Sequence, residues 1–148
     1  MHGSLGRLLS ILHRQAQVYI NYVLKELNIT AAEYAFLLCL YKKDGMTQED
    51  LSTYLYIDKS ATTRAIKSLE EKGYVFKNKD NADKRFNRIY LTPKAKEYKD
   101  EIRQKVRRWV EFLTEGLDKE TVNVVISVLE RMVDKVEQTD LKKAMEEL

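Results

Sequence analysis

The sequence predicts a mainly α-helical protein of the α+β class, with one small β-hairpin near its middle. Three observations favour this class. Apolar residues recur at three- and four-residue steps near both ends of the chain, as they do on the buried face of a helix. Two short helical patterns follow each other between residues 47 and 72. After Gly73, two runs of alternating apolar and polar residues flank a polar segment rich in turn formers, which is typical of a hairpin.

The first two helices are predicted from their apolar spacing and their caps. The first, of about 22 residues, has apolar positions at Leu5, Leu8, Leu9, Leu12, Ala16, Tyr19, Val23 and Leu27. Thr30 and Glu33 have the spacing of a capping box, so a second helix should begin there, and Asp44-Gly45 should close it.

The next two helices are short and close together. The first of these two helices is predicted at residues 47–54. Asp58 is placed to cap the second helix, which should run to about Lys72 and end at Gly73. On a helical wheel, the second helix has one apolar side and one side with hydroxyls and cations, and it carries no acid before Glu70. Such a face suits a groove lined by phosphates and base edges. The candidate recognition residues are Lys59, Ser60, Thr63, Arg64 and Lys67.

A charged hairpin follows this helix. Residues 74–77 and 87–91 are short β-type runs, and residues 78–85 between them combine turn formers with charge. Such a polar tip is either a solvated turn or a binding site for an anion. Because it directly follows a helix of the recognition type, anion binding is the favoured interpretation. Two short helices followed by a hairpin are the anatomy of a winged helix-turn-helix. The candidate nucleic-acid contacts in the wing are Asp83, Lys84, Arg85 and Arg88.

Two longer helices are expected after the hairpin. Thr92 as a cap and Pro93 at the first helical position start a long helix that continues to Leu113. Asp118 is placed to cap a last helix, which has a more polar extension toward the C-terminus.

Three motifs lie between the recognition helix and the cap after the hairpin: Leu69-Glu70-x-Lys72-Gly73-Tyr74-Val75, Asp83-x-Arg85 and Ile89-x-Leu91-Thr92. Together they resemble the signature of the MarR family of bacterial and archaeal winged-helix regulators. The resemblance implies a homodimer that binds a palindromic operator, with the recognition helix in the major groove. It also implies that Arg85 enters the minor groove and that Asp83 holds it by a charge-assisted hydrogen bond. Two positions depart from the pattern: Phe86 replaces a basic or small residue, and Ala95 a frequent glycine.

The charge distribution agrees with a nucleic-acid partner. The chain of 148 residues has a net charge of only +3. Residues 56–96, however, contain eleven basic and five acidic side chains, so this segment carries +6 and the remainder −3. A basic module on an acidic frame is the electrostatic footprint of a nucleic-acid binder.

The terminal helices carry apolar stripes wider than one small winged-helix domain can cover. A dimer interface built from both ends of the chain would bury them and would match the two-fold symmetry of most operators. We therefore expect residues 1–30 and 97–148 to form a helical dimerisation region around a winged helix-turn-helix at 31–96. A monomeric antiparallel bundle is the alternative. The predicted interface residues are Leu8, Leu12, Trp109, Leu113, Leu129 and Met132.

Two further features concern regulation. Cys39 lies in an apolar run on the second helix, where a cysteine usually behaves as a small buried hydrophobe, although a thiol redox switch is the alternative. In the family that the chain resembles, a ligand pocket lies where the first two helices meet the winged domain. His13, Arg14 and Tyr34 could face such a pocket and suit a small phenolic or other aromatic carboxylate.

Other classes find little support in the sequence. No catalytic constellation, phosphate-binding glycine loop or paired-histidine metal motif accompanies the two histidines, so we expect no enzyme, cofactor or metal. We also expect no membrane span and no signal peptide, and hence a cytoplasmic protein. The prediction is a homodimeric repressor that binds double-stranded DNA and is released by a small ligand. The alternative is a dimeric winged-helix module for a protein or RNA partner.

Overall fold

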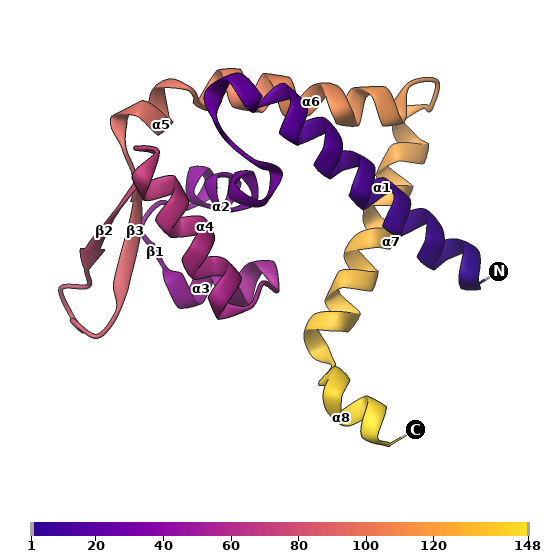
Figure 1. The fold of residues 1–148 in the computed structure, drawn as a ribbon. Coiled ribbons are helices and arrows are strands. Elements are labelled where there is room, and N and C mark those ends of the chain that lie inside the picture. Colours follow the sequence, from indigo (N-terminus) through magenta and orange to yellow (C-terminus); the bar gives the residue numbers. More distant parts are fainter. Residues whose placement is uncertain (1, 148) are drawn as a thin grey trace. The chain divides into compact units, whose positions relative to one another are not determined.

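The computed structural model describes residues 2–147, apart from the side chains at positions 2, 3 and 142. It confirms the predicted class, since helices dominate and one small sheet is present (Figure 1). The elements are α1 His2–Val23, a 3-10 turn η1 Lys25–Leu27, α2 Ala31–Lys42, β1 Met46–Thr47, α3 Gln48–Leu55, α4 Lys59–Glu71, β2 Val75–Lys79, β3 Asn87–Leu91, α5 Pro93–Glu97, α6 Lys99–Thr114, α7 Lys119–Gln138 and α8 Leu141–Glu146.

The chain divides into two compact units. The first extends to Trp109 and contains the winged helix-turn-helix, α1 and most of α6, while the second runs from Val110 to the C-terminus and contains α7 and α8. The first unit is thus larger than the 31–96 segment predicted for the winged domain. The assignment of the flanking helices to a dimerisation region stays a prediction. Among the described residues, no helix is both long and apolar enough to cross a membrane.

Side-chain caps fix the helix starts where the sequence predicts them. Thr30, Thr47, Asp58, Thr92 and Asp118 each accept a hydrogen bond from the backbone N–H three residues later. Each bond satisfies one of the amides that a helix N-terminus leaves without a partner. The local sequence is therefore sufficient to place these five helices.

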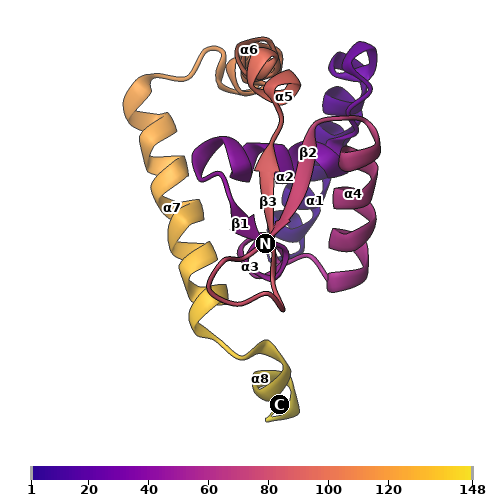
Figure 2. The same cartoon turned by 90° about the vertical axis from the view of Figure 1, so that its left-hand side faces the viewer.

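The sheet has three antiparallel strands in the order β1-β3-β2 (Figure 2). Strands β2 and β3 form the predicted wing, paired from Val75 opposite Leu91 to Lys79 opposite Asn87. Strand β1 was not predicted. It has only two residues, Met46 and Thr47, which pair with β3, and a two-residue strand shows no periodicity that a sequence pattern could reveal.

One apolar core holds the first unit together. It joins the end of α1 and η1 to α2, α3, α4, the sheet, α5 and the start of α6. The largest fully buried side chains are Leu24, Ile29, Phe36, Leu37, Leu40, Leu51, Ile66, Leu69, Tyr74, Val75, Ile89 and Ile102. Full burial of side chains of this size stabilises the fold by about 1.5–3 kcal/mol each.

Two of the predicted helices are interrupted. The long helix expected after Pro93 breaks at Tyr98, whose backbone angles (φ −87°, ψ 0°) lie outside the helix and close α5 before α6 begins. The polar extension of the last helix is likewise a separate helix, α8, because Thr139 is extended and Asp140 caps a new start. The apolar spacing continues across the first break, so periodicity alone predicted a single helix.

Gly45 connects α2 to the sheet in a conformation that favours glycine. Its φ is +75°, and an added Cβ would lie 2.8 Å from the ring of Tyr90. Its N–H donates to the carbonyl of Ile89, and its own carbonyl accepts from Arg88. The neighbouring Asp44 carboxylate accepts from the backbone N–H of Leu91. The turn is thereby fastened to β3 by both backbone and side-chain bonds.

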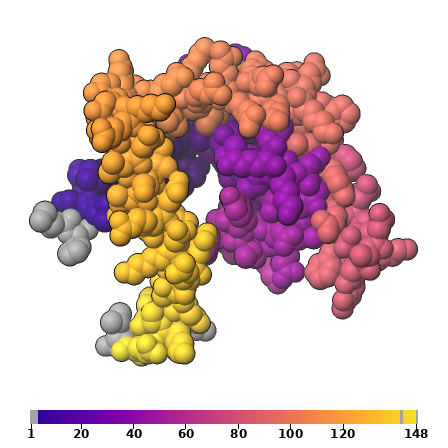
Figure 3. Space-filling model, turned by 180° about the vertical axis from the view of Figure 1, so that it is seen from behind, coloured from indigo at the N-terminus to yellow at the C-terminus, as the bar shows by residue number. Residues whose placement is uncertain are grey.

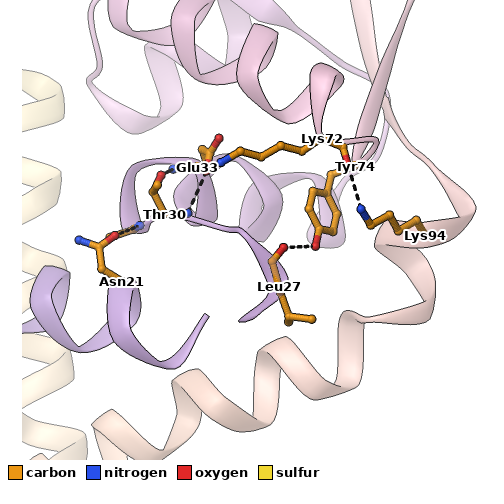
Figure 4. A network of polar contacts seen from close by, with 8 residues as sticks. Asn21, Leu27, Thr30, Glu33, Lys72, Tyr74 and Lys94 are labelled. Atoms are coloured by element: carbon orange, nitrogen blue, oxygen red, sulfur yellow. Dashed lines mark hydrogen bonds and ion pairs between the residues drawn. The ribbon is translucent and has the colours of Figure 1, made fainter. Parts of the chain in front are cut away.

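A partly buried ion pair joins the start of α2 to the end of α4 (Figure 4). Lys72 Nζ lies 2.7 Å from the Oε1 of Glu33, a residue that is only 3% exposed. Glu33 also completes the capping box with Thr30, while the Asn21 side chain accepts from the N–H of Ala31. Beside this pair, the hydroxyl of Tyr74 donates to the carbonyl of Leu27.

The surroundings of Glu33 determine its protonation. Burial raises the pKa of the carboxyl, but hydrogen bonds from Lys72, Ser68 and Thr30 outweigh burial, so the pKa lies below its ordinary value of 4.5. A group whose pKa is lowered on folding stabilises the fold above its unfolded pKa, and this contribution is lost as the pH falls through the folded pKa. The pair should therefore be fully effective at neutral pH.

Replacing Lys72 by Met should lower the free energy of unfolding by about 3 kcal/mol at neutral pH, because it leaves a buried carboxylate without its counter-ion. In this variant the pKa of Glu33 rises, because burial is no longer offset by the hydrogen bond from Lys72, so the loss should shrink as the pH approaches about 4. Chemical unfolding followed by circular dichroism at both pH values measures this. Lys67→Met, on the exposed face of α4, is the matched control. An equal loss at both pH values would contradict the role of charge.

Candidate nucleic-acid interface

Helix α4 divides into a buried and an exposed face as the wheel predicts. Thr62, Ile66 and Leu69 are buried against the rest of the domain. The side chains of the predicted recognition residues are exposed, and they lie on the first three turns of the helix: Lys59, Ser60, Thr63, Arg64 and Lys67. The structure therefore brings all five together on one accessible surface.

Hydroxyl groups fix the angle between α3 and α4. The buried hydroxyl of Ser52 donates to the hydroxyl of Thr62 at 2.9 Å, and that of Thr62 donates to the carbonyl of Asp58. Both groups are thereby satisfied, which a buried polar group requires. The N–H of Ile57 donates to the carbonyl of Ser52 and closes the turn between the helices.

A second polar link lies on the exposed side of the same two helices. The side-chain amide of Gln48, at the start of α3, donates to the hydroxyl of Thr63 at 2.7 Å. That hydroxyl in turn donates to the carbonyl of Lys59 at 2.8 Å. Sequence analysis did not identify Gln48, because only the packing of α3 on α4 brings its amide near the recognition helix.

The wing tip holds one arginine in a fixed geometry. Arg85 donates through Nε and Nη2 to both carboxylate oxygens of Asp83, with a shortest distance of 2.6 Å, while its backbone N–H also reaches this carboxylate. These bonds lower the pKa of Asp83, and its carboxylate raises that of Arg85. The Arg85 side chain is nevertheless 84% exposed. It is oriented but remains available to a partner.

The other two basic residues of the wing differ in their environments. Lys84 is exposed. Arg88 donates from Nε to Asp80 and from Nη1 to the carbonyl of Gly45, and it is half-buried. These bonds fasten the base of the wing to the turn before β1, so Arg88 has a structural function as well. Its predicted contact with nucleic acid is untested.

A hollow of about 340 Å³ separates the recognition helix from the wing. The start of α3 and the first turns of α4 form one wall, and Arg85, Phe86 and Asn87 form the other. The guanidinium of Arg85 lies 5.9 Å from the ring centre of Phe86, within reach of a cation–π interaction. The wing itself projects from the first unit (Figure 3). Lys59 of α4 and Arg85 of the wing therefore line the same hollow.

The predicted effector residues differ in their burial. His13 and Arg14 are exposed on α1, where His13 is within hydrogen-bond distance of Gln17, whereas Tyr34 is buried in α2. Burial raises the pKa of the Tyr34 hydroxyl, and the charge of Arg103 lowers it less. The role of these residues stays a prediction.

A different cavity combines aromatic and cationic groups. It has a volume of about 540 Å³ and lies between the end of α1 and α6. Tyr19 and Tyr22 provide aromatic surface, and Lys105 and Arg108 provide positive charge. Sequence analysis missed it, because these residues are far apart in the chain.

Cys39 is buried, as its apolar surroundings predict. Burial raises the pKa of its thiol, and the charge of Lys42 only partly offsets this. The thiolate is the reactive form of cysteine, so these surroundings disfavour oxidation.

Most of the predicted dimer residues expose apolar surface. Large apolar side chains of α1, of α7 and of α6 beyond Trp109 are exposed, including Leu8, Leu12, Leu113, Leu129 and Met132. Trp109 differs, because its ring stacks on Tyr19 of the same chain with centroids 5.4 Å apart. An interface function for these residues is untested.

Comparison with known proteins agrees with this geometry. The model of the MarR family matches residues 29–86. The uncharacterized HTH-type transcriptional regulator YybA of Bacillus subtilis is 27% identical over 80% of this chain and 79% of its own. MarR from E. coli, solved as a variant in complex with operator DNA, is 27% identical over 87% of this chain and 93% of its own, with a TM-score of 0.78.

A third relative is more similar. The crystal structure of a MarR transcriptional regulator from Methanosarcina mazei has 34% identity and a TM-score of 0.88 over 92% of this chain and 98% of its own. The family and these relatives are transcriptional regulators, not enzymes, as the sequence led us to expect. The fold, the matched motifs and this extent of similarity together assign the chain to the MarR family of transcriptional regulators.

Proposed function

We propose that the protein is a homodimeric repressor that binds a palindromic operator in double-stranded DNA in the cytoplasm. The observation that carries this proposal is a pair of exposed cationic elements beside one hollow. Helix α4 carries Lys59, Arg64 and Lys67, the wing tip carries Arg85, and Lys59 and Arg85 line the hollow. A major groove admits a helix, and an extended wing can reach the adjacent minor groove. The crystal structure of the similar E. coli MarR in complex with operator DNA supports this arrangement.

The side chains on α4 favour DNA over an RNA or protein partner. Arg64 has the planar fork that pairs with the O6 and N7 of guanine, and Ser60 can contact base edges. Lys59 and Lys67 suit phosphates, which position a protein without reading sequence. The major groove of A-form RNA is too narrow and deep for side chains to read.

The exposed apolar residues support the dimer. Contiguous apolar surface on a soluble protein usually marks an interface. Helix α7 exposes Val125, Leu129, Met132, Val133 and Val136, which recur at helical spacing along it. A second copy offers the same surface and would bury it in a two-fold interface.

The cavity at Tyr19, Tyr22, Lys105 and Arg108 supports a small aromatic carboxylate as the releasing ligand. Tyrosine rings can stack on an aromatic ligand, and the cations can pair with its carboxylate. A ligand that binds the DNA-free form better than the bound form shifts the population away from DNA.

Selection from a random duplex pool tests the proposal as a whole. We expect recovery of two inverted half-sites with centres about 10–10.5 base pairs apart or a multiple of this, because a two-fold dimer presents two recognition helices one helical turn apart. Recovery of a single half-site, or of RNA in a parallel selection and no duplex, would contradict it.

Arg85→Ala should lower affinity for the selected duplex about tenfold or more without changing the melting temperature, since the guanidinium is exposed and bonds only at the wing tip. Lys84→Ala removes the same charge from the next position and is the matched control. Its effect should be several-fold smaller. Equal losses of affinity in the two variants would show that only the charge of Arg85 matters, and not its orientation.

Leu129→Asp should yield a monomer that binds the operator at least about a hundredfold more weakly, because burying an unpaired carboxylate costs several kcal/mol and a half-site alone binds poorly. Sedimentation and a DNA titration measure the two effects. Asn123→Asp adds the same charge on another face of α7 and should change neither. A monomer with full operator affinity would refute the dimer.

Addition of 4-hydroxybenzoate should weaken operator binding by the wild-type protein, and Arg108→Ala should abolish this response while leaving ligand-free binding unchanged. Arg107→Ala, an exposed neighbour outside the cavity lining, is the control. Fluorescence anisotropy with and without the ligand measures the response. An identical response in wild type and Arg108→Ala would exclude this cavity as the site.

A further inference from the structure

Two adjacent threonines of the recognition helix, Thr62 and Thr63, have hydroxyls in different environments. Thr62 is completely buried and bonds to Ser52 and to the backbone of Asp58, so it is part of the domain interior. Thr63 is exposed and lines the hollow between α4 and the wing. An exposed threonine on a recognition helix would ordinarily be assigned a hydrogen bond to a base.

The Thr63 hydroxyl is already engaged as both donor and acceptor. It donates its one proton to the carbonyl of Lys59 at 2.8 Å and accepts from the amide of Gln48 at 2.7 Å. A hydroxyl has a single proton, so Thr63 cannot donate to guanine O6 or N7 or to thymine O4 while the bond to Lys59 persists. Hydrogen-bond donation to a base is thereby closed to it.

The same two bonds determine what Thr63 offers to DNA. Bonds on the hydroxyl hold the side chain in one staggered rotamer. Apart from one acceptor lone pair of the hydroxyl, the group left uncommitted is the γ-methyl. In the major groove its apolar counterpart is the C5-methyl of thymine, which no other standard base carries.

We propose that Thr63 is a specificity-determining residue that recognises the C5-methyl of thymine, and that Gln48 is the positioning residue that holds it in this orientation. The inference rests on the proposed function, because it requires α4 to enter the major groove of a duplex. The residues of α4 then make two kinds of contact with the bases. Arg64 and Ser60 make polar contacts to base edges, and Thr63 makes an apolar contact.

Single replacement of thymine by uracil in the selected duplex tests this directly, since uracil lacks only the methyl group. Each thymine of one half-site is replaced in turn, and affinity is measured by fluorescence anisotropy. In wild type, one position should cost about fourfold in affinity, the value expected for burying one methyl. Loss of this penalty identifies a variant that no longer contacts the methyl.

Two substitutions at Thr63 separate its methyl from its hydroxyl. Thr63→Val keeps a methyl and removes the hydroxyl. Valine has one strongly preferred rotamer in a helix, whereas threonine divides between two, so valine should retain the uracil penalty without the bond to Gln48. Thr63→Ser keeps the hydroxyl and removes the methyl, so it should bind the thymine and uracil duplexes equally. The reverse result, with the penalty kept by Ser and lost by Val, would overturn the inference in favour of hydroxyl reading.

The Gln48→Met variant tests the positioning role, because it keeps the length of the side chain and removes the amide donor. The uracil penalty should fall while the melting temperature stays unchanged, a combination that a purely structural role would not produce. Ser60→Ala, which removes another exposed hydroxyl from α4, should keep the penalty. If the uracil penalty is unchanged in Gln48→Met, Gln48 does not position Thr63.

Failure of the inference is distinguishable from failure of the proposed function. If the wild-type protein binds no duplex, the proposed function is wrong and the inference falls with it. If it binds the selected duplex tightly but tolerates uracil at every position, the proposed function stands and methyl recognition by Thr63 is wrong.

Discussion

The arrangement of the domain depends on the ion pair between Glu33 and Lys72. Glu33 lies in the first turn of α2, and Lys72 directly follows α4, so one contact joins the start of one helix to the end of the other. The backbone carbonyl of Lys72 also accepts from Lys94, whose ammonium lies 4.5 Å from the ring centre of Tyr74. At the opposite end of α4, the buried hydroxyl of Thr62 fixes the helix to α3. The recognition helix is thus anchored at both ends, and Thr63 on its exposed face is also bonded to α3 through Gln48.

The wing is held by a separate set of contacts. Arg88 and the carboxylate of Asp44 connect β3 to the turn before β1, while Asp83 orients Arg85 at the tip. The base of the wing is therefore rigidly connected to the helices, and its outermost cation is constrained only by its own loop. This combination fixes the direction of the wing and leaves Arg85 accessible.

Local signals in the sequence were sufficient for much of the fold. Caps such as Thr30 and Asp58 act within one turn of helix, so their effect is visible in a few residues. The Asp83–Arg85 contact is equally local, and the family resemblance identified it. Strand β1, the break at Tyr98 and the Gln48–Thr63 bond depend on elements that pack together only after folding. No local pattern contains them, and the same is true of the cavity at Tyr19 and Arg108.

The close approach of Gly45 to Tyr90 constrains how this sequence can diverge. Position 45 needs a left-handed backbone, and the ring opposite leaves no room for a Cβ. Asparagine, the residue that best tolerates this conformation after glycine, would still collide with the ring. Among homologues, a residue other than glycine at position 45 should therefore occur together with a smaller side chain at position 90. The two positions lie far apart in the chain, yet they should vary as a pair.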